Sequence, residues 1–214
     1  MELAAGIEVR VVSGGESARL MDFLHEHYYR EEPLTLGTDP PQPDAADEAF
    51  LLSNIPHGTC LVALLGDRIV GAVVAGPKTA DEAAHLFEDA ERLKGTKWGR
   101  ILSILAVAER DANVCARFDV ERALHAHALG VDVSMRGRRI GARLMTELAA
   151  LARRLKYPLL TVDCTSIYSA RLVQQLGYEL VNTIRYDSHK DSSGQPVIKP
   201  PAPHESLQTY ALRL

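Results

Sequence analysis

The sequence predicts a single mixed α/β domain, because strand-like and helix-like segments alternate along a chain long enough for one sizeable core. Its 214 residues are 46% hydrophobic and 24% charged, a composition typical of globular proteins. No segment approaches the roughly 20 apolar residues needed to cross a bilayer. We therefore expect one domain over residues 1–214, monomeric and without a membrane partner.

Hydrophobic periodicity assigns the elements of the N-terminal half. Apolar residues at alternate positions predict strands, and apolar residues three or four apart predict helices. Gly66-Asp67 between two apolar runs is a strong hairpin signal. In chain order, the patterns predict a strand at 6–12, a helix through 20–27, a hairpin over 59–76, and helices at 81–94 and 100–113.

The C-terminal half continues the alternation. A glycine at 177, just past a short apolar helix pattern, is a typical helix stop. The patterns predict a strand at 122–133, a helix at 140–155, a strand at 157–164, a helix at 169–176, and strands at 179–186 and 206–213.

A cluster of four arginines follows the strand at 122–133 and extends into the helix at 140–155. Its members are Arg136, Arg138, Arg139 and Arg143. A helix N-terminus attracts anions, and the small Gly141 and Ala142 would let a ligand approach the backbone. The alternative is a solvated helix face. Because the net charge is −4, any anion site must be local, and we expect no nucleic-acid partner.

The loop Arg136-x-x-Arg139-x-Gly141-Ala142 resembles the pyrophosphate loop of the GCN5-related N-acetyltransferases (GNAT), usually Gln/Arg-x-x-Gly-x-Gly/Ala, with Arg139 in place of the first glycine. Three further stretches, "REEPL" at 30–34, "CTSIYSARLVQQLGY" at 164–178 and "IKPPAPH" at 198–204, are similar to the insect-type arylalkylamine (dopamine) N-acetyltransferases. "LHAHALGV" at 124–131 is similar to a strand of vertebrate serotonin N-acetyltransferase. The resemblance covers nearly the whole chain.

This resemblance implies a GNAT-like fold, in which helices flank a central mixed, mostly antiparallel sheet. It implies an acetyl-CoA-dependent acyltransferase that acetylates an arylalkylamine such as dopamine, tyramine, octopamine, serotonin or tryptamine in a ternary complex, without a metal. Three cysteines without metal-type spacing and an N-terminus without a basic, apolar leader pattern add the expectation of a reduced, cytoplasmic protein.

The resemblance also implies catalytic roles. Glu32 matches the carboxylate that removes the amine proton through water. Because Glu32 directly precedes Pro33, extended backbone is favoured there. His125 and His127 lie two apart in a strand, so they share a face and could relay a proton. Thr165 and Ser169 match hydroxyls implicated in protonating the leaving thiolate. The alternatives are an exposed loop acid for Glu32 and simple packing for the histidines.

The coenzyme is expected along the strand edge and the arginine loop, with a β-bulge at Gly130. The implied contacts are Leu129, Val131, Asp132, Val133, Arg136, Gly137, Arg138, Arg139, Ile140, Gly141, Ala142, Arg143, Ser166 and Arg171. The implied amine contacts are Tyr28, Pro33, Tyr168 and His204. Val173 stands where many family members have a catalytic tyrosine, and Trp98 is expected to pack a helix.

Two alternatives remain at this point. The acceptor can instead be agmatine, a polyamine or an amino acid, or the donor a longer acyl-CoA; a second cationic end requires extra carboxylates, and the sequence does not place Glu31, Asp39 or Asp44 well enough to decide. The chain can also be a non-catalytic CoA-binding module, which the joint presence of Glu32, the histidines and the hydroxyls argues against.

Overall fold

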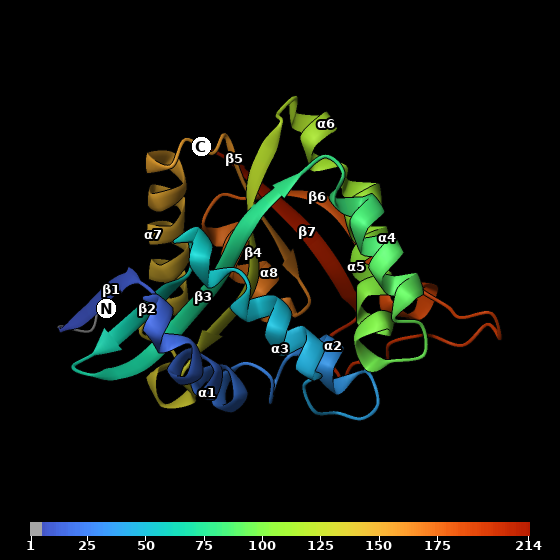
Figure 1. Cartoon of the computed structure of the whole chain (residues 1–214), viewed down its shortest axis with the longest axis horizontal. Helices are drawn as coiled ribbons and strands as arrows, with labels where there is room; N and C mark the ends of the chain where they lie inside the picture. The colour runs from blue at the N-terminus through green and yellow to red at the C-terminus, as the bar shows by residue number, and fades with distance from the viewer. Residues whose placement is uncertain (1–5) are drawn as a thin grey trace.

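A seven-stranded sheet in the order β1-β2-β3-β4-β5-β7-β6 forms the centre of the protein (Figure 1). The computed structural model describes residues 6–214. All neighbouring strands are antiparallel except β4 and β5. The strands are β1 (Ile7–Val11), β2 (Leu61–Leu65), β3 (Arg68–Thr79), β4 (Arg122–Val131), β5 (Leu159–Cys164), β6 (Glu179–Arg185) and β7 (Ser206–Arg213). The predicted mixed, mostly antiparallel sheet is confirmed.

Helices cover both faces of this sheet. One face packs against α7 (Ile140–Arg154) and α8 (Ile167–Gln175). On the other face, α1 (Ser17–His27) and α3 (Ala45–Leu52) cover the β1–β4 side, while α5 (Lys97–Ala112) covers β6 and β7 and supports α4 (Glu82–Arg92). The short helices are α2 (Pro33–Leu36) and α6 (Val114–Phe118). Figure 1 shows α1–α3 and the α4–α5 pair as two separate groups.

Three helices are absent from the sequence prediction, and their local causes are visible. α3 follows a proline-rich segment, but the Asp44 carboxylate caps it by accepting the Ala46 N–H at 2.9 Å, a typical helix-start signal. α2 is one turn that begins at Pro33, and α6 has five residues, so both are too short for a periodic pattern. Within residues 6–214, no helix is both long and apolar enough to cross a membrane.

Strands β4 and β5 pair over only three positions, from Leu124–Leu160 to Ala126–Val162. Both strands continue beyond this point, β4 as far as Val131 and β5 as far as Cys164. The β5-facing edge of β4 therefore lacks a partner strand over residues 127–131. Its N–H and C=O groups are free for an extended ligand.

A β-bulge in β4 accompanies this separation, and it lies at His127 rather than at the predicted Gly130. Gly130 pairs regularly with Ala72, whereas Ala126 pairs with Ala75 and Ala128 with Val74, which leaves His127 as the extra residue. Core packing agrees, because the residues facing α7 change from Leu124 and Ala126 to Leu129 and Val131. A period-2 pattern cannot reveal where one residue is inserted.

The junction between α4 and α5 predicts a stability effect at Gly99. A Cβ there would lie 2.2 Å from the Leu93 carbonyl oxygen, so Gly99→Ala should lower the free energy of unfolding by about 1–3 kcal/mol, despite alanine's helix preference of about 1 kcal/mol. Urea denaturation measures this. Gly14→Ala is the matched control, because its Cβ would meet nothing within 4 Å; equal stability of both variants would contradict the close packing.

Candidate active site

A cavity of about 80 Å³ lies on the sheet face that carries α1, α3 and α5, where β4 and β5 separate. Residues from α2, α3, α4, α5, β3, β4 and β5 line it, together with residues of the segments that follow α1 and β5. Five residues predicted from the sequence are among them: Tyr28, Glu32, His125, His127 and Thr165. The structure therefore brings these five together from three distant parts of the chain.

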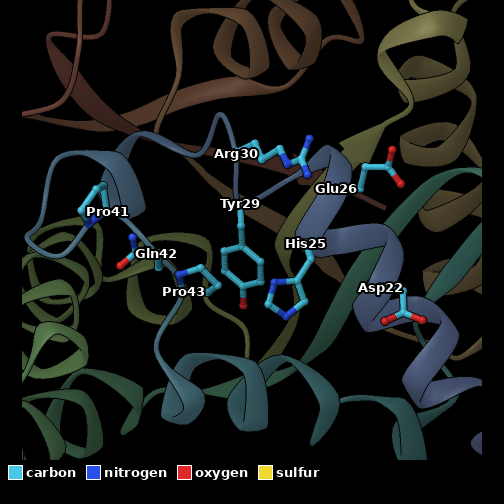
Figure 2. Close-up of a pocket in the computed structure, with 8 residues that line it drawn as sticks. All are labelled: Asp22, His25, Glu26, Tyr29, Arg30, Pro41, Gln42 and Pro43. Carbon is cyan, nitrogen blue, oxygen red and sulfur yellow. The ribbon is translucent and has the colours of Figure 1, made fainter.

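A larger hollow of about 430 Å³ lies between α1 and the proline-rich segment 41–43. Figure 2 shows the Tyr29 ring between His25 and Pro43 in this hollow. None of the sequence-predicted catalytic, coenzyme or amine residues lines it. Size alone therefore does not identify the candidate active site, because the sequence-predicted side chains line the smaller cavity.

His125 and His127 share one face of β4, as predicted, with ring centroids 4.9 Å apart. The Nδ1 atom of His125 lies 2.8 Å from the Thr161 hydroxyl, and its Nε2 lies 3.7 Å from an Asp163 carboxylate oxygen. The His127 ring also packs edge-on against Phe50 at 4.9 Å. These contacts fix both rings in place.

The two histidines do not titrate near pH 6.5 as expected. Burial, and then the neighbouring Lys78 ammonium, lower the pKa of His125 well below its usual range and that of His127 to about 3. Both imidazoles are therefore neutral at pH 7. Each can donate one hydrogen bond and accept another, but neither carries a second ring proton at neutral pH.

Glu32 is buried in the cavity wall rather than exposed on a loop. Its backbone is extended, with φ −72° and ψ 120°, and its side chain caps α2. The two carboxylate oxygens accept the N–H groups of Leu34 at 3.0 Å and Thr35 at 2.5 Å. These bonds fix the orientation of the carboxylate.

The cavity wall is acidic. Five carboxylates line it: Glu32, Asp47, Glu82, Glu109 and Asp163. Lys78 is the one lysine or arginine on this wall, and its buried ammonium donates to Glu109. Burial raises the pKa of the Glu82 and Asp163 carboxyls. The cavity thus has a surplus of carboxyl groups that a cationic ligand would neutralise.

Sequence reasoning missed four of these acids and the lysine. Lys78 and Asp163 are charged residues inside otherwise apolar strands, and that is the signal that would have found them. The acids weighed from the sequence lie elsewhere: Glu31 pairs with Arg136 on the surface, Asp44 caps α3, and Asp39 is exposed.

The arginine loop enters α7 through two left-handed residues, Gly137 at φ 77° and Arg139 at φ 61°. Arg139 is the N-cap and makes no side-chain capping bond. The first N–H groups of this 15-residue helix have no partner within the helix. Arg138 and Arg139 are exposed and make no ion pair within residues 6–214. This end of α7 suits an anion such as a pyrophosphate.

Three of the residues assigned to this loop have other contacts. Arg136 is exposed and forms an ion pair with Glu31 at 2.6 Å. Arg143 donates to the Ile7 carbonyl at 2.8 Å and so fastens β1 to α7. A Cβ on Gly141 would lie 3.0 Å from Leu172, so this glycine allows α7 to approach α8.

The other residues predicted beside the coenzyme follow the free edge of β4. Leu129 and Val131 are half-buried against the α7 core, and Asp132 accepts the Ser134 N–H and faces Arg68. Val133 is exposed, Ile140 is buried and Ala142 is half-buried. Only backbone groups of this strand are available to a ligand along the edge.

The hydroxyl residues before α8 separate into two roles. Thr165 lines the cavity. Ser166 caps α8 by accepting the Ser169 N–H at 3.0 Å, and the two hydroxyls are also 3.0 Å apart. Ser169 is half-buried near Thr165 along the chain but does not line the cavity. Val173 is fully packed in the core.

The remaining predicted amine contacts lie outside the cavity wall. Pro33 is buried as the first residue of α2. Tyr168 is 63% exposed and packs edge-on against His204 at 5.6 Å, and the His204 Nδ1 accepts the Ile167 N–H at 3.4 Å. Arg171 is exposed. Trp98 packs against Phe50 at 5.6 Å, and it also lines the cavity.

Within residues 6–214, no group of three or more histidine, cysteine or acidic side chains is arranged to hold a metal ion. The three cysteines, Cys60, Cys115 and Cys164, are buried and free. The cavity wall itself presents carboxylates, imidazoles and a hydroxyl.

The chain matches known acetyltransferases in sequence and in structure. A model of the acetyltransferase (GNAT) family matches residues 21–178. The crystal structure of an agmatine N-acetyltransferase mutant in its apo form is 57% identical, with a TM-score of 0.95, over 98% of this chain and 100% of that one.

Two further solved structures extend the comparison. A Drosophila melanogaster polyamine N-acetyltransferase, described as catalysing the formation of N-acetylagmatine, is 58% identical with a TM-score of 0.95, over 97% of this chain and 100% of that one. A mosquito arylalkylamine N-acetyltransferase-like protein, 5b, is 32% identical with a TM-score of 0.91, over 97% and 100%. Use of acetyl-CoA is a property of this family. The chain belongs to the acetyltransferase (GNAT) family.

Proposed function

We propose that this enzyme acetylates agmatine or a polyamine rather than an arylalkylamine. The observation that carries the proposal is the cavity, where five carboxyl groups face a single lysine. Agmatine and polyamines bring a second positive charge, whereas an arylalkylamine brings one charge and an apolar ring. The higher identity to agmatine and polyamine enzymes, 57% and 58% against 32%, supports the same choice.

The free edge of β4 and the start of α7 are the proposed site for acetyl-CoA. Unpaired backbone groups of residues 127–131 can exchange hydrogen bonds with the pantetheine amides. The unbonded N–H groups at the start of α7, with Arg138 and Arg139, can hold the pyrophosphate. In this position the thioester lies beside His127, at the mouth of the cavity.

Acetyl-CoA supplies an activated acetyl group as a thioester. Glu32 takes the proton from the protonated amine, directly or through water, because an alkylamine with a pKa near that of lysine, about 10.4, is otherwise unreactive at pH 7. The freed nitrogen adds to the thioester carbonyl, and N–H groups of β4 stabilise the oxyanion. Collapse of the tetrahedral intermediate breaks the C–S bond, and the acetylated nitrogen gives up its second proton. A hydroxyl at Thr165 or Ser169 passes this proton to the departing thiolate, so the hydroxyl itself stays neutral.

The neutral histidines have a secondary part in this scheme. With pKa values far below 7, His125 and His127 act as hydrogen-bonding groups that orient water between Glu32 and the amine. A non-catalytic CoA-binding protein would need neither the ordered Glu32 carboxylate nor the acidic cavity, so the catalytic interpretation is preferred.

The proposed function predicts which amines the enzyme prefers. With saturating acetyl-CoA, kcat/KM for agmatine or spermidine should exceed that for tryptamine and dopamine at least tenfold, because each extra charge pair with a carboxylate contributes more than about 1.4 kcal/mol in a desolvated site. A thiol-release assay over this panel measures it. A preference for the arylalkylamines would reject the proposal.

Glu32→Gln should lower kcat/KM for the amine about 100-fold and remove the pH dependence that the carboxylate provides, because general bases typically contribute 10²–10⁴-fold. Glutamine keeps the side-chain length and one capping acceptor for α2. Glu31→Gln is the control, since Glu31 is exposed and pairs only with Arg136. If both variants behave alike between pH 6 and 9, the base lies elsewhere.

Arg138→Ala should raise KM for acetyl-CoA about tenfold while changing KM for the amine little, because it removes a charge-assisted phosphate contact. The increase should shrink at high salt, as exposed charges are screened. The control is Arg154→Ala, an exposed arginine at the other end of α7. An unchanged affinity for CoA would show that the coenzyme does not bind at this loop.

A further inference from the structure

We propose that Asp47 and the neighbouring aromatic pair Phe50–Trp98 form a subsite for a planar guanidinium, the end of the substrate that is not acetylated. This inference rests on the proposed function and assigns the second charge of the substrate to one carboxylate. It also separates agmatine, with a guanidinium, from polyamines, whose distal charge is an ammonium.

Asp47 is a buried acid without a counter-ion. It is 7% exposed and lines the cavity from the first turn of α3. Within residues 6–214 its carboxylate makes no ion pair. The buried Tyr29 hydroxyl faces it as a hydrogen-bond donor and has no other partner. Such groups are costly unless a ligand satisfies them.

The wall beside Asp47 is aromatic. Phe50 lies three residues further along α3, so its side chain shares a helix face with Asp47. Its ring packs against Trp98 at 5.6 Å on one side and against His127 at 4.9 Å on the other. A guanidinium is flat, weakly hydrated and stacks on aromatic rings while its N–H groups bind a carboxylate in pairs. An ammonium has no flat face to use this wall.

The other carboxylates of the cavity are less suited to this role. Glu109 is bound to Lys78, Asp163 accepts the Thr209 hydroxyl at 2.7 Å, and Glu32 holds two N–H groups of α2. Glu82 has no counter-ion but is only half-buried and lies on α4, next to the Lys78–Glu109 pair. Asp47 is therefore the buried carboxylate of this wall that neither a cation nor a backbone N–H group holds, and only the Tyr29 hydroxyl faces it.

The protonation state of Asp47 gives the proposed subsite a second property that can be measured. Burial, and then the charge of Glu32, raise the pKa of the Asp47 carboxyl to about 8. The groups that face it are Tyr28 and Tyr29 just after α1, Glu32 before α2, Asp44 and Glu48 near its own turn, and Lys97 on α5. Asp47 therefore carries a proton in most molecules at pH 7. A bound guanidinium favours the ionised form, so binding releases that proton.

The test compares wild type, Asp47→Asn and the matched control Glu82→Gln, each with agmatine, putrescine and n-pentylamine. Asp47→Asn should raise KM for agmatine about tenfold or more and leave n-pentylamine within about threefold, which also shows that the variant folds. Glu82→Gln should change the ratio between these substrates little. Phe50→Leu should weaken agmatine more than putrescine.

The second readout is calorimetry of agmatine binding to the CoA-saturated enzyme at pH 7, in two buffers of different ionisation enthalpy. Wild type should release close to one proton more than Asp47→Asn, and wild-type affinity should rise with pH until about 8. Loss of protein stability alone would not change this proton count.

The outcomes separate the two proposals. If wild type does not prefer agmatine or putrescine over n-pentylamine, the proposed function fails, and the subsite fails with it. If wild type prefers agmatine and Asp47→Asn retains both the preference and the proton release, the subsite is overturned while the function stands. Equal losses in Asp47→Asn and Glu82→Gln would also overturn it, because the recognition would then be diffuse.

Discussion

The early separation of β4 from β5 is the constraint on which the rest of the site depends. Their parallel ladder ends at Ala126–Val162, and the extra residue His127 bends β4 away at that point. The opening admits a cavity on one face of the sheet. It also leaves the edge of β4 unpaired up to the arginine loop. One interruption of the sheet therefore creates the proposed places for both substrates.

The buried charged groups of the cavity influence one another. Lys78 and Glu109 form a buried pair, which is tolerated because each ion satisfies the other. The positive end of this pair lies close enough to His125 and His127 to help keep them neutral. In the proposed mechanism, proton removal is assigned to a carboxylate, and Glu32 is already oriented by two backbone N–H groups. The neutral histidines then do not compete for the proton.

The strands and five of the helices, α1, α4, α5, α7 and α8, were predictable because their apolar residues recur with a clear period. Glycines also marked the hairpin turn at Gly66 and the helix end at Gly177. The family resemblance supplied Glu32 and the histidines. The position of the bulge was not predictable, because alternation looks the same on either side of one inserted residue. Asp47 was missed because its helix was missed. Gly141 shows that a small residue in such a loop can serve helix packing as well as ligand approach.

A net charge of −4 conceals two opposite local fields. The exposed Arg138 and Arg139 lie at the outer end of the β4 edge, whereas the surplus carboxyl groups are enclosed between the two helix groups. In the proposed function, an anionic coenzyme and a polycationic amine would thus be drawn to different ends of one opening. Salt screens exposed charges strongly and buried ones weakly. The proposed selectivity for the amine would therefore depend on the buried carboxyl groups more than on the surface charges.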